Sequence, residues 1–321
     1  MRGGKLVKKY LFKSNANIYK ANLHCHTTVS DGTRTPRQIK AMYKAAGYSV
    51  VAFTDHDILQ NHSYLNDDGF LAINACEFAV TQHLPGQPFE KRKVYHFNLY
   101  APDPNATQTP EPMSMAYDDM DAINQYISDR TAEGYLVSYN HPYWSLQTYA
   151  DYSGLKGCFA MEIYNHGCEV KDGYYGYNPQ AYDEMLRCQN RICCLSTDDN
   201  HNAPSPGDPN SKSFGDSFGG FVMIDSSGLT YGDVFDSLRR GDFYSSQGPE
   251  IHEISLHGNI LGVKCSKACL IVVYTDGRRC YIQKGEALTE AEFPLSGNEE
   301  YIRVMCRDKD HKDANSNAYW L

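Results

Sequence analysis

A capped helix followed by a wholly apolar strand is the feature of this sequence that most limits its fold. Thr35 is predicted to cap a helix over about 36–46, with Pro36 at its first position, Gln38 completing a capping box and Gly47 as a left-handed stop. The next residues, YSVVAFTD, form a continuous β-branched run, which is typical of a strand buried on both faces of a parallel sheet. This order predicts a strand–helix–strand unit.

Similar units recur along the chain as far as Gly248. Further strands are predicted at 70–78, 94–101, 135–142, 158–165, 192–199 and 219–225, and further helices at 113–134, from Pro179 with Asn178 as its cap, and from Thr230 to about Gly241. Seven or eight strands alternating with helices indicate a β/α barrel over residues 1–248. Short strands and turns without a helix signal follow, and they predict a small all-β sandwich over residues 249–321.

Composition and charge exclude several classes of function. The 321 residues carry a net charge of -9 and no basic run beyond EKRK near residue 91, which argues against a grip on long nucleic acid. The 11 cysteines are odd in number and include the adjacent pair Cys193 and Cys194, so reduced thiols fit better than a disulfide framework. Neither a signal-peptide core of roughly 7–15 apolar residues nor a span of roughly 18 is visible. We therefore expect a cytoplasmic protein without a membrane partner.

Histidines and carboxylates gather where the predicted strands end. In the stretch NLHCHTTVSDG, His24 and His26 are alternate residues of a strand, so both imidazoles point to one place. An isolated pair of this kind is more often two half-buried polar residues. However, ligand-type residues also follow the other strands, at the edge where β/α barrels collect functional groups: His56, Glu77, His141, Asp198, Asp199 and His201. His96 is the exception, because it lies near the start of its predicted strand. A metal site is the prediction.

The motifs HCHTTVSDG, FTDHD, ACE, the histidine of VYHF, NHP and TDDNH resemble, in this order, those of the PHP family, the polymerase and histidinol phosphatase domains. The resemblance covers roughly residues 20 to 248, and it implies a metal-dependent phosphoesterase with a distorted (β/α)7 barrel, followed here by an immunoglobulin-like sandwich. It also implies two or three divalent ions.

The resemblance implies a ligand set for these ions. His24, His26, Glu77 and an aspartate of TDDNH would hold the first ion, and Glu77 would bridge to a second ion bound also by His96 and His141. Asp31, His56 and His201 would hold a third ion, although some family members have a histidine in place of Asp31. The family pattern Asp-x-His selects Asp199 as the ligand, and Asp198 is then expected to support the ligands from behind.

Asp57 and Arg34 are candidates for roles in catalysis and substrate binding, and each has a simpler alternative. Asp57 is a candidate to orient a ligand imidazole or to protonate a leaving group, and a solvated loop acid is the alternative. Arg34 follows the Ser-Asp-Gly turn and is a candidate to contact a phosphate, with simple solvation as the alternative. Surface or core roles are expected for the histidines outside every motif: His62, His83, His166, His252, His257 and His311.

The expected function is hydrolysis of a small anionic phosphomonoester or phosphodiester by a metal-activated hydroxide. Imidazole and carboxylate ligands suit manganese, iron or zinc. Two alternatives stay open at this point: the same centre acting on a carboxyl ester, amide or carbamate, and an inactive module that binds a glycan or a protein partner. The sequence does not predict an oligomeric state.

Overall fold

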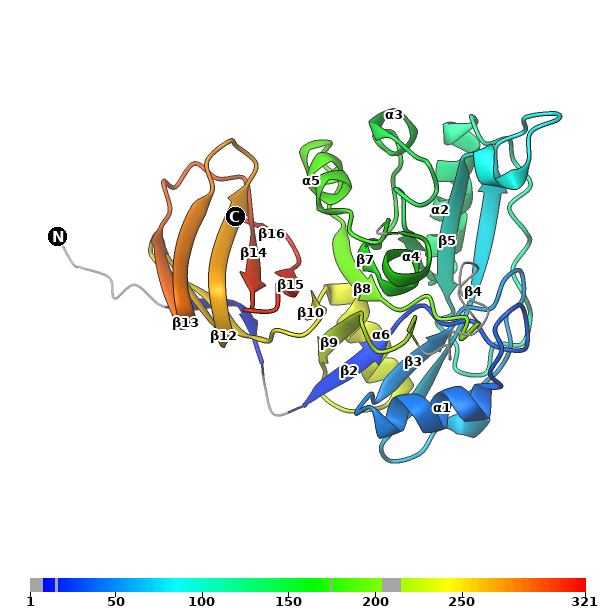
Figure 1. Cartoon of the computed structure of the whole chain (residues 1–321), viewed down its shortest axis with the longest axis horizontal. Helices are drawn as coiled ribbons and strands as arrows, with labels where there is room; N and C mark the ends of the chain where they lie inside the picture. The colour runs from blue at the N-terminus through cyan, green and yellow to red at the C-terminus, as the bar shows by residue number, and fades with distance from the viewer. Residues whose placement is uncertain (1–7, 15–16, 174, 204–214) are drawn as a thin grey trace.

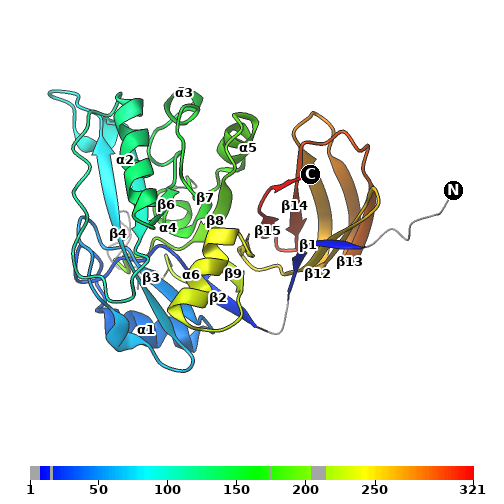
Figure 2. The ribbon, with the colours of Figure 1, turned by 180° about the vertical axis from the view of Figure 1, so that it is seen from behind.

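A computed structural model describes residues 8–14, 17–173, 175–203 and 215–321 of the chain. It shows an α/β fold built on a large mixed sheet with few helices, which confirms the α/β class, while the (β/α)7 barrel stays a prediction (Figure 1). Two regions are distinguished below: the α/β region, residues 18–246, and the terminal β region, which consists of residues 8–14 and 251–321. Figure 2 shows the same two regions from behind.

The α/β region contains most of the helices and the parallel strands. Its strands are β2 (Ile18–Asn22), β3 (Val50–Phe53), β4 (Leu71–Thr81), β5 (Val94–Tyr100), β6 (Leu136–Tyr139), β7 (Ala160–Asn165), β8 (Cys193–Thr197), β9 (Phe221–Asp225) and β10 (Phe243–Ser246). Its helices are α1 (Pro36–Ala45), α2 (Met120–Ala132), α3 (Tyr149–Tyr152), α4 (His166–Lys171), α5 (Pro179–Arg187) and α6 (Tyr231–Arg240), with short 3-10 turns η1 (Ser63–Leu65) and η2 (Phe89–Lys91).

Strands β2 to β8 are neighbours in the order of the sequence. All pairs are parallel except those of β5, which runs antiparallel to both β4 and β6. A parallel bridge between Cys25 and Asn200, just beyond β2 and β8, brings the two ends of this series together. The reversed β5 departs from the regular alternation that the sequence pattern suggested, because β4 connects to it through a loop containing only η2.

Local sequence signals account for the helix ends. The Thr35 side chain accepts from the backbone of Gln38 in a complete capping box, and Gly47 has φ 81°, as expected. Helix α2 begins later than predicted, at Met120 instead of about residue 113, because the Asp119 side chain caps it by accepting from the Ala122 N–H at 3.0 Å. The strand–helix pattern is therefore more reliable than its boundaries.

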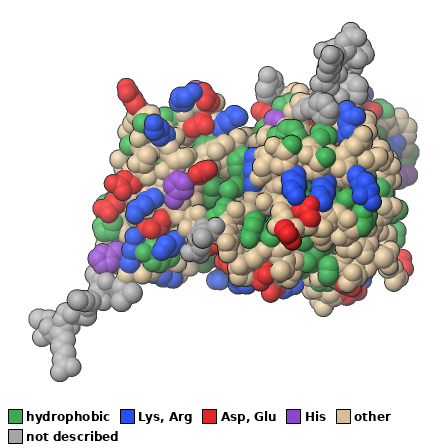
Figure 3. All heavy atoms as spheres, turned by 90° about the horizontal axis from the view of Figure 1, so that it is seen from below, with side chains coloured by type: hydrophobic (Ala, Val, Ile, Leu, Met, Phe, Trp, Pro, Cys, Tyr) green, Lys and Arg blue, Asp and Glu red, His purple; other side chains and the backbone are tan. Residues whose placement is uncertain are grey.

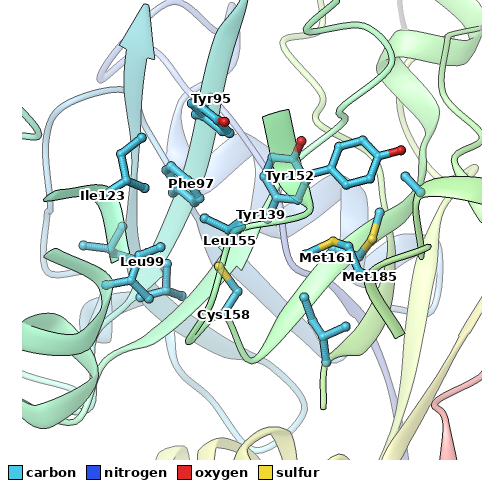
Figure 4. Packing of buried hydrophobic residues seen from close by; sticks show 14 of the residues in the cluster. Tyr95, Phe97, Leu99, Ile123, Tyr139, Tyr152, Leu155, Cys158, Met161 and Met185 are labelled. Atoms are coloured by element: carbon cyan, nitrogen blue, oxygen red, sulfur yellow. The ribbon is translucent and has the colours of Figure 1, made fainter. Parts of the chain in front are cut away.

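A cluster of buried aromatic and aliphatic side chains fills the space between α2 and strands β5 and β6. Ile123 of α2 and Phe97 and Leu99 of β5 have no exposed surface and lie in this cluster, as Figure 4 shows. Each such side chain contributes about 1.5–3 kcal/mol on burial. The direction of β5 itself follows its antiparallel pairing with β4 and β6, and it matters for the candidate site.

The terminal β region is antiparallel, and residues 251–321 contain no helix. Its strands are β1 (Lys9–Lys13), β11 (Ile251–His257), β12 (Ile260–Thr275), β13 (Tyr281–Pro294), β14 (Tyr301–Arg307), β15 (Asp313–Ser316) and β16 (Tyr319–Trp320). Strand β1 pairs with β11, and Phe12 packs in the same apolar core as Ile254 and Val304. The division into domains at residue 248 and the immunoglobulin-like topology stay predictions.

A buried ion pair joins the two regions. Arg303 of β14 is 1% exposed, and its guanidinium donates to both carboxylate oxygens of Asp183 on α5, at 2.6 and 2.8 Å. The face of Arg303 also lies 3.9 Å from the Tyr274 ring centroid. A desolvated charge of this kind requires its partner, so α5 and the terminal β region are held together by more than apolar packing.

Candidate metal centre

Nine histidine and carboxylate side chains converge at one place in the α/β region. They form four overlapping groups, and within each group the potential ligand atoms lie within 4.8 Å of one another. The groups are His24, His26 and Glu77; His24, His141 and Asp199; Glu77, His96 and His141; and His26, Asp31, His56 and His201. These are the nine residues that the sequence analysis put forward as ligands. Their convergence is observed, and their role as ligands stays a prediction.

His24 and His26 emerge directly after β2 and point to the same spot. Their Nε2 atoms lie 3.1 Å apart, and both lie 3.1 Å from Oδ1 of Asp199. Neither histidine has exposed surface. Two ring nitrogens this close, facing one carboxylate oxygen, form an arrangement that a shared cation would stabilise.

Glu77 of β4 lies at the middle of the cluster. Its Oε1 is 3.3 Å from Nε2 of His24 and 3.1 Å from Nδ1 of His96. Its Oε2 is 3.4 Å from Nε2 of His26 and 3.2 Å from Nδ1 of His56. Burial opposes ionisation, but His24 and His96 hold the pKa of the Glu77 carboxyl well below its usual range. Glu77 is therefore a buried anion that contacts histidines from three strands.

The antiparallel direction of β5 explains the position of His96. In a parallel strand, a residue near the start would lie at the end of the sheet away from the site. Because β5 runs the other way, its first residues lie beside the last residues of β4, and His96 pairs with Ala79 while Asn98 pairs with Glu77. The strand-end rule holds once the direction of each strand is known.

The group formed by His26, Asp31, His56 and His201 lies nearer the surface. Nε2 of His201 is 3.4 Å from Oδ2 of Asp31, Nε2 of His56 is 3.8 Å from the same oxygen, and Nδ1 of His26 is 3.8 Å from Oδ1. The side chain of Asp31 is 55% exposed, against 1% for Glu77. This group is therefore less enclosed than the others.

Two observations indicate that these side chains are suited to bind divalent ions. Nδ1 of His26 and Oδ1 of Asp199 are buried without a hydrogen-bond partner, which is costly for polar atoms unless something else satisfies them. Burial lowers the pKa of His26, but Asp199 and Glu77 outweigh it and raise that pKa to about 9. The carboxylates thus demand positive charge here, and divalent ions would supply it in exchange for protons.

The two adjacent aspartates point in different directions. Asp199 faces the histidines, whereas Asp198 accepts hydrogen bonds from the Phe218, Gly219 and Gly220 backbone N–H groups and from the Tyr43 hydroxyl. Burial raises the pKa of Asp198 to about 6 against these bonds. The geometry therefore favours Asp199 over Asp198 at the centre. Asp198 anchors the segment before β9, and its expected role behind the ligands stays a prediction.

Sequence reasoning missed a carboxylate that holds the histidines in place. Glu162 of β7 has no exposed surface, and its Oε1 lies 2.7 Å from Nδ1 of His24 and accepts from Thr197 Oγ1 at 2.6 Å. Its Oε2 accepts from the backbone of His141 at 3.1 Å and from the Asn165 amide at 2.9 Å. An acid inside the apolar strand AMEIYN was the available signal.

The loop that carries Asp31 is held by a second residue that the sequence analysis did not single out. Asp55 accepts from the Thr27 backbone at 2.7 Å and from the Ser30 hydroxyl at 2.8 Å. A side chain at Gly32 would meet the His26 carbonyl carbon at 2.6 Å, so only glycine allows this loop to fold back on the histidine pair.

A cavity of about 250 Å³ opens onto the centre. Besides predicted ligands, the cavity is lined by Phe89, Trp144, Gly167, Cys168, Lys171 and Asp172. The Trp144 ring lies edge-on to His141, with centroids 5.1 Å apart. Helix α4 follows β7 directly, which places its last residue, Lys171, over the cavity.

The remaining candidates lie outside this cavity. Neither Asp57 nor Arg34 is among the described residues that line it. Asp57 is exposed, and its N–H donates to the Glu77 carbonyl at 2.9 Å. Their proposed roles as acid and phosphate contact stay predictions. Among the described residues, the metal-suited groups include none of the histidines that were expected to have other roles, namely His62, His83, His166, His252, His257 and His311.

A search of the described helices finds none with the length and apolar character needed to cross a membrane. No protein-family model and no curated protein matches the chain.

Twelve chains of solved structures are similar to it, including the following three. One is a two-domain protein containing a predicted PHP-like metal-dependent phosphoesterase from Bacteroides vulgatus, at 14% identity and TM-score 0.48, covering 98% of each chain. Another is a lesion-specific endonuclease from Pyrococcus furiosus, at 15% identity and TM-score 0.43, covering 70% of this chain and 56% of that one. An amidohydrolase from Chromobacterium violaceum has 12% identity and TM-score 0.35, covering 56% and 87%. The first description names the family that the six motifs resemble, and the functional argument below rests on this chain's own residues.

Proposed function

We propose that the chain is a metal-dependent hydrolase of the PHP type, with a distorted (β/α)7 barrel and an immunoglobulin-like sandwich, and that it cleaves a small phosphomonoester or phosphodiester. The observation that carries the proposal is the position of Glu77. This buried carboxylate contacts His24, His26, His56 and His96, which come from three separate segments of the chain. A structural ion pair needs one partner, whereas this arrangement suits a carboxylate that bridges cations.

Two to three ions of manganese, iron or zinc suit this mixture of imidazole and carboxylate donors. The buried groups around Glu77 and Asp199 would hold two ions, and the group around Asp31 would hold a third. When bound, such ions lower the pKa of a water molecule and neutralise charge on a phosphoryl group.

Contacts within the chain fix which ring nitrogen of three of these histidines faces the centre. Nδ1 of His24 is engaged by Glu162, Nδ1 of His141 lies 3.2 Å from the Ser145 hydroxyl, and Nδ1 of His201 lies 3.0 Å from the Asp199 carbonyl. In each ring the Nε2 atom is thereby left for the cluster. Three histidines are thus prepared as ligands before any ion arrives.

The cavity supports a small anionic substrate. Lys171 lines it and is the one cationic side chain of its described lining other than histidines, with its Nζ 3.4 Å from Asp216. On the face shown in Figure 3, basic and acidic side chains of the described residues are interspersed, an arrangement poorly suited to following a long phosphate backbone. A compact phosphoester fits this distribution of charge better than a nucleic acid duplex.

Hydrolysis of model esters tests the proposal. The full chain, reconstituted with Mn²⁺, would be assayed on p-nitrophenyl phosphate, bis(p-nitrophenyl) phosphate and p-nitrophenyl acetate, each with and without excess chelator. We expect chelator-sensitive hydrolysis of at least one phosphate ester. Turnover of the acetate alone would favour carboxyl-ester or amide chemistry, and binding of ions without turnover would favour an inactive binding module.

A further inference from the structure

A second cavity, of about 490 Å³, lies beside the metal centre between α3, α5 and the segment after β6. Figure 1 shows α3 and α5 next to each other, with β7 and α4 below them. Four tyrosines line the cavity: Tyr143, Tyr149, Tyr152 and Tyr177. The function proposed above makes no use of this space.

The two cavities share a wall. His141 and Trp144 line the metal cavity, whereas Pro142 and Tyr143, between them in sequence, line the tyrosine cavity. Consecutive Cα atoms are about 3.8 Å apart, so the Cα atoms of His141 and Tyr143 are separated by less than about 8 Å. The two cavities therefore flank one short segment, and a ligand that occupied both would have to pass over it.

Two of the four tyrosines that line this cavity are exposed, whereas Tyr152 is buried. Tyr143 is 55% exposed and Tyr149 is 52% exposed. Tyr175, at 37%, places its ring centroid 4.8 Å from that of Tyr143. The Tyr143 backbone is fixed, because its N–H donates to the Asn178 side chain at 3.1 Å. The ring of Tyr143 thus projects from an anchored backbone position, and much of its surface stays available for a ligand.

The polar residues of the cavity favour a neutral, hydroxyl-bearing ligand. Gln180 and Glu184 of α5 line it, and its described lining contains no lysine or arginine. The Gln180 amide donates to one Glu184 oxygen at 2.9 Å and the Tyr152 hydroxyl donates to the other, which leaves one further lone pair on each oxygen for a ligand donor. A second phosphate would be repelled here, whereas hydroxyl groups would be accepted.

We propose that the tyrosine cavity binds a carbohydrate ring that forms the leaving group of the substrate, stacked on Tyr143 with its hydroxyls facing Gln180 and Glu184. This inference rests on the proposed phosphoester hydrolysis, because it assigns the phosphoryl group to the metal cavity. The substrate class is then a sugar phosphate.

Steady-state kinetics of three proteins test the assignment: wild type, Tyr143→Ala and the matched control Tyr64→Ala. Tyr64 is 54% exposed, like Tyr143, but is not part of either cavity. The Mn²⁺-loaded full chain would be assayed on methyl phosphate, on glucose, galactose and mannose 1-phosphates, and on adenosine 5′-monophosphate. Binding of the best hexose phosphate would be measured separately by calorimetry.

We expect wild type to prefer one hexose phosphate over methyl phosphate. Tyr143→Ala should lower kcat/KM on that hexose phosphate by about tenfold, mainly through KM, and leave methyl phosphate within twofold. Tyr64→Ala should change neither. Equal losses on both substrates, or a preference for adenosine monophosphate or methyl phosphate, would overturn the carbohydrate assignment. If no ester is hydrolysed but hexose phosphate binding still depends on Tyr143, the proposed function fails and the subsite stands; if that binding is also absent, both fail.

Discussion

The candidate metal centre has two parts that differ in burial. The inner part, formed by His24, His26, Glu77, His96, His141 and Asp199, is enclosed, and the side chains of His24 and Glu77 are at most 1% exposed. The outer part, formed by Asp31, His56 and His201, has side chains that are 55%, 31% and 21% exposed. Charges attract far more strongly away from water, so an ion held by the inner part should resist removal while an outer ion should exchange readily.

Removing the charge of Glu77 should have the largest effect. Glu77→Gln keeps the size of the side chain but removes the bridging charge, and two divalent cations about 4 Å apart repel each other by roughly 17 kcal/mol even at an effective dielectric of 20. We expect both inner ions to weaken together and activity to fall by at least about 10²-fold, measured by elemental analysis and phosphatase assay. Near-normal activity with a full complement of ions would show that Glu77 is not the bridge.

His62→Ala is the control for that variant, because His62 is also buried but lies outside every metal-suited group among the described residues. Its metal content should equal that of wild type, two to three ions per chain. Fewer than one ion per chain in reconstituted wild type would contradict the assignment of the whole centre.

A smaller effect is expected from Glu162→Gln, which acts through His24. The amide no longer accepts a charge-assisted bond from Nδ1 of His24 and leaves the neighbouring Thr197 bond weaker. Metal affinity of the inner part should fall by about 10–100-fold in competition with a chromogenic chelator. Glu253→Gln, in the terminal β region, serves as the matched control, and an equal loss there would refute the positioning role.

Asp31→Asn should affect only the outer part. We expect loss of one ion at most, with activity reduced by less than about tenfold, because the inner groups do not include Asp31. Loss of all ions from this variant would mean that the two parts are one cooperative site and that the difference in burial has no functional meaning.

The terminal β region should have the least effect on the metal centre. Arg303→Ala leaves Asp183 without its buried partner and should lower the free energy of unfolding by about 3–5 kcal/mol in denaturant titrations. The folded fraction should nevertheless bind the same number of ions. Reduced metal content in folded Arg303→Ala would show that residues 251–321 help to form the site.

The sequence predicted the converging residues well because their signals are local. Alternating histidines on one strand, and acids or histidines directly after apolar runs, place side chains through backbone geometry alone. His24 and Glu77 are of this kind. The same reasoning found the α/β class and the capping box of α1.

The sequence did not predict features that depend on direction or on distant contacts. The reversal of β5 leaves no trace in its own residues, so His96, correctly expected near the start of its strand, was expected at the wrong edge of the sheet. Glu162 looked like one polar residue inside a strand, because its partners are supplied by three other segments. Asn178 was predicted to cap α5, but its side chain makes no cap bond and accepts from Tyr143 instead.

The pairing of β1 with β11 has a consequence for synthesis of the protein. Lys9 pairs with Leu256, so β1 leaves the ribosome long before its partner exists. At about 5–20 residues per second, the delay is roughly 12–50 seconds, during which β1 presents unpaired edges. Completion of the terminal β region must therefore follow translation of nearly the whole chain, and a chaperone that shields nascent strands should raise the yield of native protein.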